Sequence, residues 1–236
     1  MDELVNRAVE YGYQTELSSI VMPRTAKKAM APGRPKDLGK RDAILAAAKR
    51  LFASHGFDGI SMDAIAQAAG VSKLTVYSHF GDKDALFKAA VAAKCEEQMP
   101  AAMFRVPPGT PLRDALLAIA RGFHGLIHSP ESLSLHRMMI ANAGQDAHLA
   151  ELFFEAGPRL TLDGFEHFLR QAIAAGQLDV PDPARAAQHF FCLLKGIGHL
   201  KQLCGCQKPV PRKEVAAHID SVVDMFLRAY GTKRAR

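Results

Sequence analysis

Residues 61–80 contain two short helical patterns that meet at one glycine, and this arrangement limits the possible folds most strongly. Ser61 precedes the first apolar-periodic run and has the chemistry of an N-cap, because its hydroxyl can accept a hydrogen bond from a free amide. Gly70 follows that run where the chain must turn sharply, which favours a residue that tolerates positive φ. Val76 and Phe80 lie one turn apart on the inner side of the second run. The sequence therefore predicts two short helices joined by a tight turn.

The second predicted helix leaves hydroxyl and cationic side chains on its outer side. Such a helix suits the major groove of DNA, where base edges present donors, acceptors and the thymine methyl group. We therefore interpret residues 61–86 as a helix-turn-helix, although an ordinary solvated face is the alternative for any one residue. Base contacts are predicted for Lys73, Leu74, Thr75 and Ser78, and phosphate contacts for Ser61, Tyr77, His79 and Lys83. Ser72 completes the predicted DNA-binding set.

Positive charge is concentrated near the N-terminus. The whole chain has a net charge of +6, and residues 24–41 alone hold seven cations against one carboxylate, Asp37. We interpret residues 1–33 as a flexible basic arm. Arg34 and Lys36, on either side of a proline, are predicted to enter a narrow, electronegative minor groove, with a solubilising tail as the alternative. The translation start stays open between Met1, Met22 and Met30.

From Lys40 the sequence is predicted to be helical almost to its end, so the expected fold class is all-α. Glycine or proline marks each junction, and proline recurs at first helical positions because its fixed φ suits a helix start. A head of residues 34–88 would carry the helix-turn-helix, and residues 89–236 would form a helical body. Longer helices are predicted at Asp42–His55, from Asp82 onward, Leu112–His128, Pro130–Ala141, Ala147–Glu155, Pro158–Ala175, Pro183–Leu203 and Pro211–Tyr230.

Between Lys40 and Leu86 the apolar and polar positions follow one another in a specific order. They are Ile44, Ala48, Leu51, Phe52, Gly56, Phe57, Ile65, Ala66, Ala69, Gly70, Val71, Ser72, Thr75, Val76, Tyr77, His79, Phe80, Lys83 and Leu86. This order resembles the tetracycline-repressor (TetR) family of bacterial transcription regulators. The remainder resembles, more loosely, the branch of the AefR regulator. Leu74 departs from the family, which usually has a glycine-like residue there, so the family's base preference does not transfer to that position.

The resemblance implies a homodimer that binds a roughly palindromic operator in double-stranded DNA. The helices near Pro183–Leu203 and Pro211–Tyr230 would form a four-helix interface between two copies. Their apolar stripes agree with this, because two helix pairs cover such stripes more fully than one. A pocket for a small-molecule effector between the middle helices would control the spacing of the two heads.

Aromatic and sulfur-containing side chains recur at helical spacing in the predicted body. Such stripes usually form core, and that is the default interpretation. A subset could line a cavity, because Met and Phe make adaptable apolar walls and nearby polar groups could orient a ligand. The candidate ligand-binding residues are Phe123, His124, Arg137, Met138, Asn142, Phe165, Phe168 and His189.

Metal and redox chemistry receive little support from the sequence. His124 and His128 share a helical face, but neither an HExxH pattern nor a third ligand accompanies them, so no metal site and no cofactor is predicted. Cys192, Cys204 and Cys206 lack the spacing of common zinc or redox pairs. We interpret them as buried thiols that act as small apolar side chains, with oxidation sensing as the alternative.

Together these features favour a DNA-binding transcription regulator, most simply a repressor that a small apolar or amphipathic ligand releases from its operator. A ligand-independent architectural DNA-binding dimer is the alternative, which a body without a pocket would favour. An enzyme is disfavoured, since the sequence has no nucleophile–base pair, phosphate loop or metal set. No apolar run approaches a membrane span, and the charged first residues differ from a secretory signal, so we expect a cytoplasmic protein.

Overall fold

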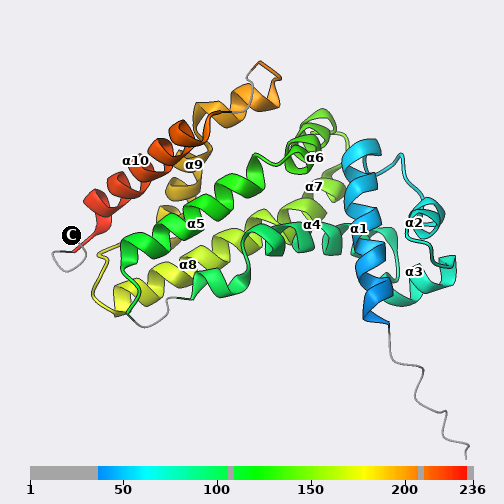
Figure 1. Cartoon of the computed structure of the whole chain (residues 1–236), viewed down its shortest axis with the longest axis horizontal. Helices are drawn as coiled ribbons and strands as arrows, with labels where there is room; N and C mark the ends of the chain where they lie inside the picture. The colour runs from blue at the N-terminus through cyan, green and yellow to red at the C-terminus, as the bar shows by residue number, and fades with distance from the viewer. Residues whose placement is uncertain (1–36, 106–108, 207–209, 233–236) are drawn as a thin grey trace, which may run out of the picture. The chain divides into compact units, whose positions relative to one another are not determined.

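The structure, a computed structural model, describes residues 37–105, 109–206 and 210–232, and every regular element among them is helical (Figure 1). The prediction of an all-α fold is confirmed. The predicted arm of residues 1–33, together with Arg34 and Lys36, lies outside the described residues. Within the described ranges no helix is long and apolar enough to cross a membrane.

Helix boundaries follow the local chemistry closely. The predicted bounds of the helices Pro130–Ala141 and Pro183–Leu203 agree with the structure, and those of the helices predicted from Leu112, Ala147, Pro158 and Pro211 differ by one residue at one end. The helix predicted from Asp42 begins earlier, because Asp37 accepts a hydrogen bond from the Lys40 amide at 3.4 Å. The elements are α1 (Leu38–His55), α2 (Met62–Ala68), α3 (Lys73–Phe80), α4 (Lys83–Gln98), η1 (Ala101–Phe104), α5 (Leu112–Ile127), α6 (Pro130–Ala141), α7 (Ala147–Ala156), α8 (Pro158–Ala174), α9 (Pro183–Leu203) and α10 (Arg212–Tyr230).

Side-chain caps decide where several helices begin. Ser61 Oγ accepts a hydrogen bond from the Ala64 amide at 3.1 Å, as predicted for the start of α2. The Asp82 carboxylate accepts one from the Ala85 amide at 2.7 Å at the start of α4. Between α2 and α3, Gly70 has a φ of +67°, which a residue with a Cβ rarely adopts. These contacts, with caps typically worth about 1 kcal/mol each, fix the turn that places α3.

A first apolar cluster joins α1–α4 to α7, with α6 packed against it. The rings of Phe52 and Phe87 meet edge to face with centroids 5.2 Å apart, and Phe57 packs on both. Leu149 and Leu152 of α7 are buried in the same cluster. Apolar burial, worth on the order of 25 cal/mol per Å², therefore holds α7 to the first four helices. The predicted boundary after residue 88 falls inside α4 and stays a prediction.

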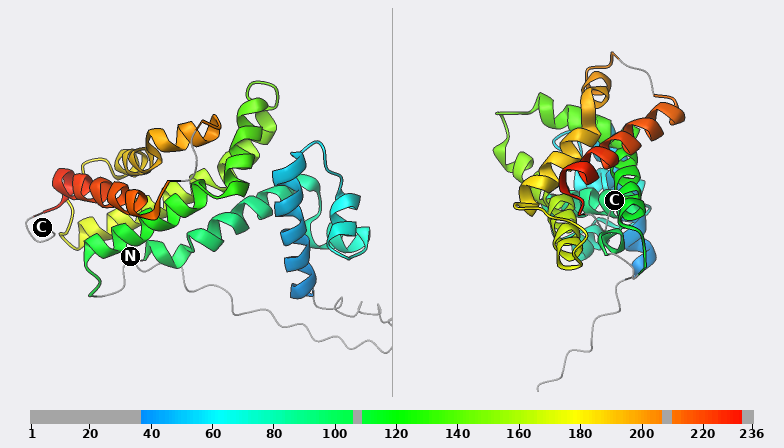
Figure 2. Two further views of the ribbon diagram at one scale, coloured as in Figure 1. Left: turned by 45° about the horizontal axis from the view of Figure 1, so that its top comes forward. Right: turned by 90° about the vertical axis from the view of Figure 1, so that its left-hand side faces the viewer.

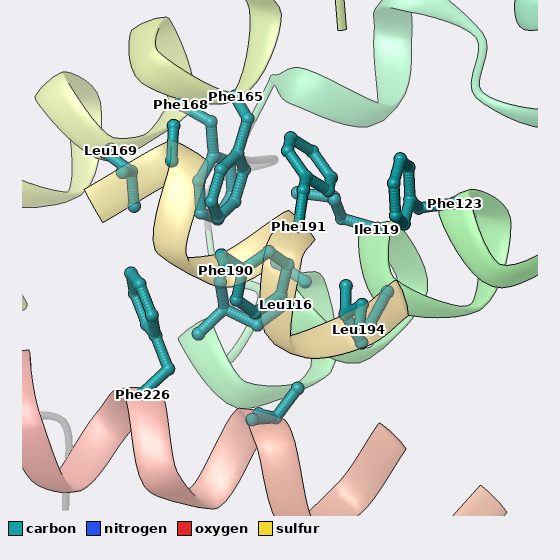
Figure 3. Close-up of a cluster of buried hydrophobic side chains, with 14 of the residues drawn as sticks. Leu116, Ile119, Phe123, Phe165, Phe168, Leu169, Phe190, Phe191, Leu194 and Phe226 are labelled. Atoms are coloured by element: carbon teal, nitrogen blue, oxygen red, sulfur yellow. The ribbon is translucent and has the colours of Figure 1, made fainter. Parts of the chain in front are cut away.

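A second apolar cluster fills the space between α5, α8, α9 and α10 (Figure 3). The Phe165 ring centroid lies 4.6 Å from that of Phe190 and 5.6 Å from that of Phe168. Phe226 of α10 reaches Phe190 at 5.1 Å. Phe165 and Phe168, predicted as ligand-binding candidates, are thus fully buried core residues.

Helix α9 contains a break at Gly196, where φ is +53° and ψ is −175°. Helices α9 and α10 lie side by side (Figures 1 and 2), and His218 Cε1 of α10 is 3.3 Å from where a Cβ at residue 196 would lie. His218 Nε2 also lies 3.1 Å from the Leu194 carbonyl oxygen. The helix predicted at 183–203 is therefore two helical segments joined at Gly196. Glycine suits this joint, because a residue with a Cβ would be strained at this φ and close to His218.

Candidate DNA-binding surface and an internal cavity

Helix α3 has one buried side and one exposed side. Val76 and Phe80 are buried in the first apolar cluster, while Leu74 is 78% exposed and Tyr77 is 41% exposed. An exposed leucine makes no contribution to the core, so its methyl groups are available to a partner such as a thymine methyl. The geometry of α3 therefore agrees with a helix that reads DNA from its outer side.

The predicted contact Lys73 is held by a neighbouring carboxylate. Its Nζ lies 2.9 Å from Asp63 Oδ1 of α2 and 5.9 Å from the Tyr77 ring centroid. The hydrogen bond to Asp63 raises the pKa of Lys73 further above neutral pH, and its ammonium group stays charged. Exposed ion pairs are weak and screened by salt, so a phosphate or a guanine acceptor can replace Asp63 when DNA binds.

The four predicted serine and threonine contacts, Ser61, Ser72, Thr75 and Ser78, already form hydrogen bonds within the local fold. Ser72 caps α3, since its Oγ accepts a hydrogen bond from the Thr75 amide at 3.2 Å and lies 2.8 Å from Thr75 Oγ1. Ser78 Oγ donates to the Thr75 carbonyl at 2.8 Å. Ser61 caps α2 in the same way. Their contacts to DNA stay predictions.

Two cations lie on aromatic rings beside α3. Lys83 Nζ is 4.3 Å from the Phe57 ring centroid, and Arg41 Cζ is 5.3 Å from that of Phe80. The predicted phosphate contact His79 has a buried Nδ1 without a hydrogen-bond partner. Arg41 was not among the predicted contacts, although it ends the basic stretch noted in the sequence. Arg41 lies in the first turn of α1, and its guanidinium group lies over a ring of α3.

A cavity of about 120 Å³ lies among α4 to α9. Its polar lining includes Lys94, Cys95, His136 and Lys195, none of which the sequence singled out. A larger groove of about 630 Å³ over α1, α4 and α6 shares Lys94 and three other lining residues with it. The rest of the cavity wall is mainly apolar and consists of Val91, Phe123, Leu126, Ile127, Leu135, Phe153, Pro158 and Phe191, together with Ser132, Gly157 and Thr161.

Of the predicted ligand-binding residues, which all fall in the described ranges, Phe123 alone lines this cavity. Phe165 and Phe168 belong to the second apolar cluster, and Met138 packs against the first. His189 lines a separate groove of about 310 Å³ formed by α9 and α10. The structure therefore does not gather these residues at one site.

The remaining polar candidates bind the protein's own atoms. Arg137 donates hydrogen bonds to the carbonyl oxygens of Leu203 at 2.9 Å and Gln202 at 2.6 Å, which ties α6 to the end of α9. Asn142 Nδ2 donates to the Met138 carbonyl at 2.9 Å at the end of α6. The His124 ring stacks on another imidazole, as described next. The ligand-binding role of these residues stays a prediction.

Four histidines from α5, α6 and α9 lie close together. The rings of His124 and His128 stack with centroids 4.0 Å apart, and His199 meets His128 at 5.3 Å and His136 at 5.5 Å. Burial lowers the pKa of His124, His136 and His199 to about 4, and neighbouring imidazoles or Lys195 add to this. In the described part of the chain no three His, Cys, Asp or Glu residues are arranged to hold a metal ion. The imidazoles of His124, His136 and His199 are neutral at pH 7, since their pKa lies well below it.

Lowering the pH from 7 to 5 should destabilise the protein by about 2 kcal/mol in total, a figure reduced for the partial exposure of these histidines. The folded pKa of about 4 for His124, His136 and His199 lies below the ordinary value of 6.5. The unfolded chain therefore binds these protons first, and the free energy of unfolding declines between about pH 6.5 and pH 4. Urea unfolding at both pH values measures the effect. In a His199→Phe variant the decline should be smaller, and an unchanged decline would contradict this explanation.

The three C-terminal cysteines are exposed, so the interpretation that they are buried apolar thiols is wrong. Cys192 lies on the outer side of α9, while Cys204 and Cys206 lie where that helix ends and the chain turns away from the core. Cys95 of α4 is the half-buried thiol, and burial raises its pKa to about 11. Cys95 is therefore protonated and unreactive, because the thiolate is the reactive form.

Comparison with known families agrees with this geometry. A model described as "Bacterial regulatory proteins, tetR family" matches residues 44–90, and one described as "AefR-like transcriptional repressor, C-terminal domain" matches residues 114–232. The chain belongs to the TetR family. Both resemblances expected from the sequence are confirmed. TetR-family proteins are DNA-binding transcription regulators that function as dimers, and they are not enzymes.

Individual relatives of this TetR-family regulator cover most of its length. The HTH-type transcriptional regulatory protein RaaS of Mycobacterium tuberculosis is 29% identical over 197 residues, which span 82% of this chain and 84% of RaaS. The flavonoid-responsive regulator FrrA is 34% identical, with a TM-score of 0.64 over 84% of this chain and 100% of FrrA. A TetR transcriptional regulator from Agrobacterium tumefaciens is 26% identical, with a TM-score of 0.69 over 83% of this chain and 96% of that protein.

Proposed function

We propose that this TetR-family regulator is a repressor that inserts α3 of each copy into the major groove of a roughly palindromic operator. The exposed Leu74 and Tyr77 and the charged Lys73 support this, because they lie on the one side of α3 that the core does not cover. Arg41 and Lys83 lie over the rings of Phe80 and Phe57 and would contact phosphates, which set the register on the duplex. The regulator would act on chromosomal DNA in the cytoplasm.

In this proposal α9 and α10 form the interface between the two copies. Leu193, Ile197 and Leu200 of α9 and Met225 of α10 are large apolar side chains that remain exposed. A second copy related by a two-fold axis would cover the same residues on both sides. The two recognition helices would then face successive major grooves about 34 Å apart.

The helices that line the cavity also pack against α1, and this supports release from DNA by a ligand. Helix α1 packs against α4 and α6, and Ser134 Oγ of α6 donates a hydrogen bond to the Ala53 carbonyl of α1. The same two helices contribute Lys94 and His136 to the cavity. A ligand that fits one arrangement of α4 and α6 better would move α1, and with it α3, to a spacing that misfits the operator. This shared wall carries the proposal and favours it over an architectural DNA-binding dimer.

Selection of bound duplexes from a random DNA pool by the purified full chain tests the proposal. The expected result is an enriched palindrome with half-sites one helical turn apart, bound by an even number of protein copies. Light scattering of the complex gives that number. Recovery of no preferred sequence, or of complexes that contain a single chain, would overturn the proposed function.

A further inference from the structure

The cavity among α4 to α9 is small, and three phenylalanine rings contribute to its wall. Its volume of about 120 Å³ is close to that of an engineered apolar cavity of roughly 150 Å³ that binds benzene. Phe123, Phe153 and Phe191 contribute rings from three different helices. A ligand enclosed there would have one ring and few other atoms.

The charged side chains that line the cavity are both cationic. Lys94 is neutralised by Glu131, whose Oε2 lies 3.2 Å from its Nζ. Lys195 lines the cavity from α9, and among the described residues no hydrogen bond or ion pair engages its ammonium group. Since no carboxylate lines the cavity, Lys195 leaves it with a net positive charge.

His136 adds an unused hydrogen-bonding atom to the same cavity. Its Nδ1 is buried and has no partner, although buried polar atoms nearly always have one. Burial, followed by the charge of Lys195, lowers the pKa of His136 to about 4. The imidazole is neutral and can donate one hydrogen bond. Lys195 and His136 line the same small cavity, so one ligand group inside it can bind both side chains.

Helix α8 begins at the cavity wall. Gly157 precedes the helix and offers no side chain to cap it, and both Gly157 and Pro158 line the cavity. Free amides at a helix start carry partial positive charge and attract anions. The start of α8 therefore favours the same kind of ligand group as Lys195 and His136.

We propose that the effector is a monocyclic aromatic anion whose ring packs among Phe123, Phe153 and Phe191 and whose charged oxygen binds Lys195 and His136. A carboxylate or a phenolate provides such an oxygen. A neutral ring of the same size would offer Lys195 and His136 no anionic acceptor, and a cationic one would be repelled by Lys195. The inference rests on the proposed function, since that function assigns the cavity to the effector.

Calorimetry on the full chain without DNA tests the ligand class. Benzoate, benzamide and benzylamine share a ring and similar size, and at pH 7 they are anionic, neutral and cationic. Benzoate should bind at least about 10-fold more tightly than benzamide, because its charged oxygen forms a charge-assisted hydrogen bond. Benzylamine should not bind. Equal affinities for benzoate and benzamide, or no binding of any probe, would overturn the proposal.

Matched variants locate the anion site. Lys195→Met should abolish the preference for benzoate. Because the Lys195 side chain is exposed, the substitution should not impair folding. Lys201→Met alters a second exposed lysine of α9 that does not line the cavity, and it should retain the preference. His136→Phe should weaken benzoate binding more than benzamide binding. An equal preference in the Lys195→Met and Lys201→Met variants would rule out the assigned site.

Operator binding is measured separately on the same preparation. If the protein selects an operator but shows no preference for benzoate, the proposed ligand class is overturned and the proposed function stands. A benzoate preference in a protein that selects no DNA supports the anion site and overturns the proposed function. The two proposals can therefore fail independently.

Discussion

Replacing Leu74 with glutamate should weaken operator binding by about 100-fold or more, because each of two copies loses a base contact worth about 1–3 kcal/mol. The new carboxylates would also face DNA phosphates and be repelled by them. Leu74 is 78% exposed, so the variant loses no packing and should keep the unfolding temperature of the parent. Fluorescence anisotropy with the selected operator at fixed salt concentration measures the change.

The matched control for this variant is Leu160→Glu. Leu160 is 54% exposed on α8, so the same chemical change is made at a surface position outside the helix-turn-helix. It should leave operator affinity within about 2-fold of the parent, because a surface charge away from the DNA contact matters little. If both variants lost affinity equally, or if Leu74→Glu bound normally, α3 would not be the helix that reads the DNA.

Replacing Phe165 with alanine should lower the free energy of unfolding by about 3–5 kcal/mol. Its side chain is fully buried between Phe168 and Phe190, so the substitution removes an aromatic ring and leaves a void that the rigid neighbours cannot fill. Urea unfolding followed by circular dichroism measures the loss. The protein concentration must be held constant, since the stability of a dimer depends on it.

Phe154→Ala is the comparison for the Phe165 variant. Phe154 is 44% exposed on α7, and the guanidinium of Arg159 lies 5.4 Å from its ring centroid. Its removal should cost about 1–2 kcal/mol, because only part of the ring is buried and its cation–π contact is exposed. Similar losses in the two variants would show that Phe165 is not part of a tightly packed core.

Helix boundaries were predictable from sequence because the groups that set them are adjacent in the chain. Ser61 and Asp82 cap the helices that follow them, and Gly70 supplies the backbone conformation of the turn. Each of these effects involves residues within one turn of each other. Helix α1 begins earlier than predicted because Asp37 caps it. The sequence prediction treated Asp37 only as the one carboxylate in a basic stretch.

The cavity was not predictable in the same way. Phe123 was singled out, but Lys195 and His136 come from two other helices, and only tertiary packing brings them to the same space. The exposure of Cys192 has a similar origin, because the side of α9 that faces the core depends on where α8 and α10 lie. Apolar periodicity shows that a helix has an inner side without showing which partner covers it.

The positive-φ joint at Gly196 lies within the surface proposed to join the two copies, because Leu193 before it and Ile197 and Leu200 after it are all exposed. Leu194, next to Leu193, is anchored in the aromatic core. A substitution at residue 196 would therefore change the angle between the two halves of the proposed seam while its first half stayed fixed to the interior. Such a change would alter the operator length that the pair recognises.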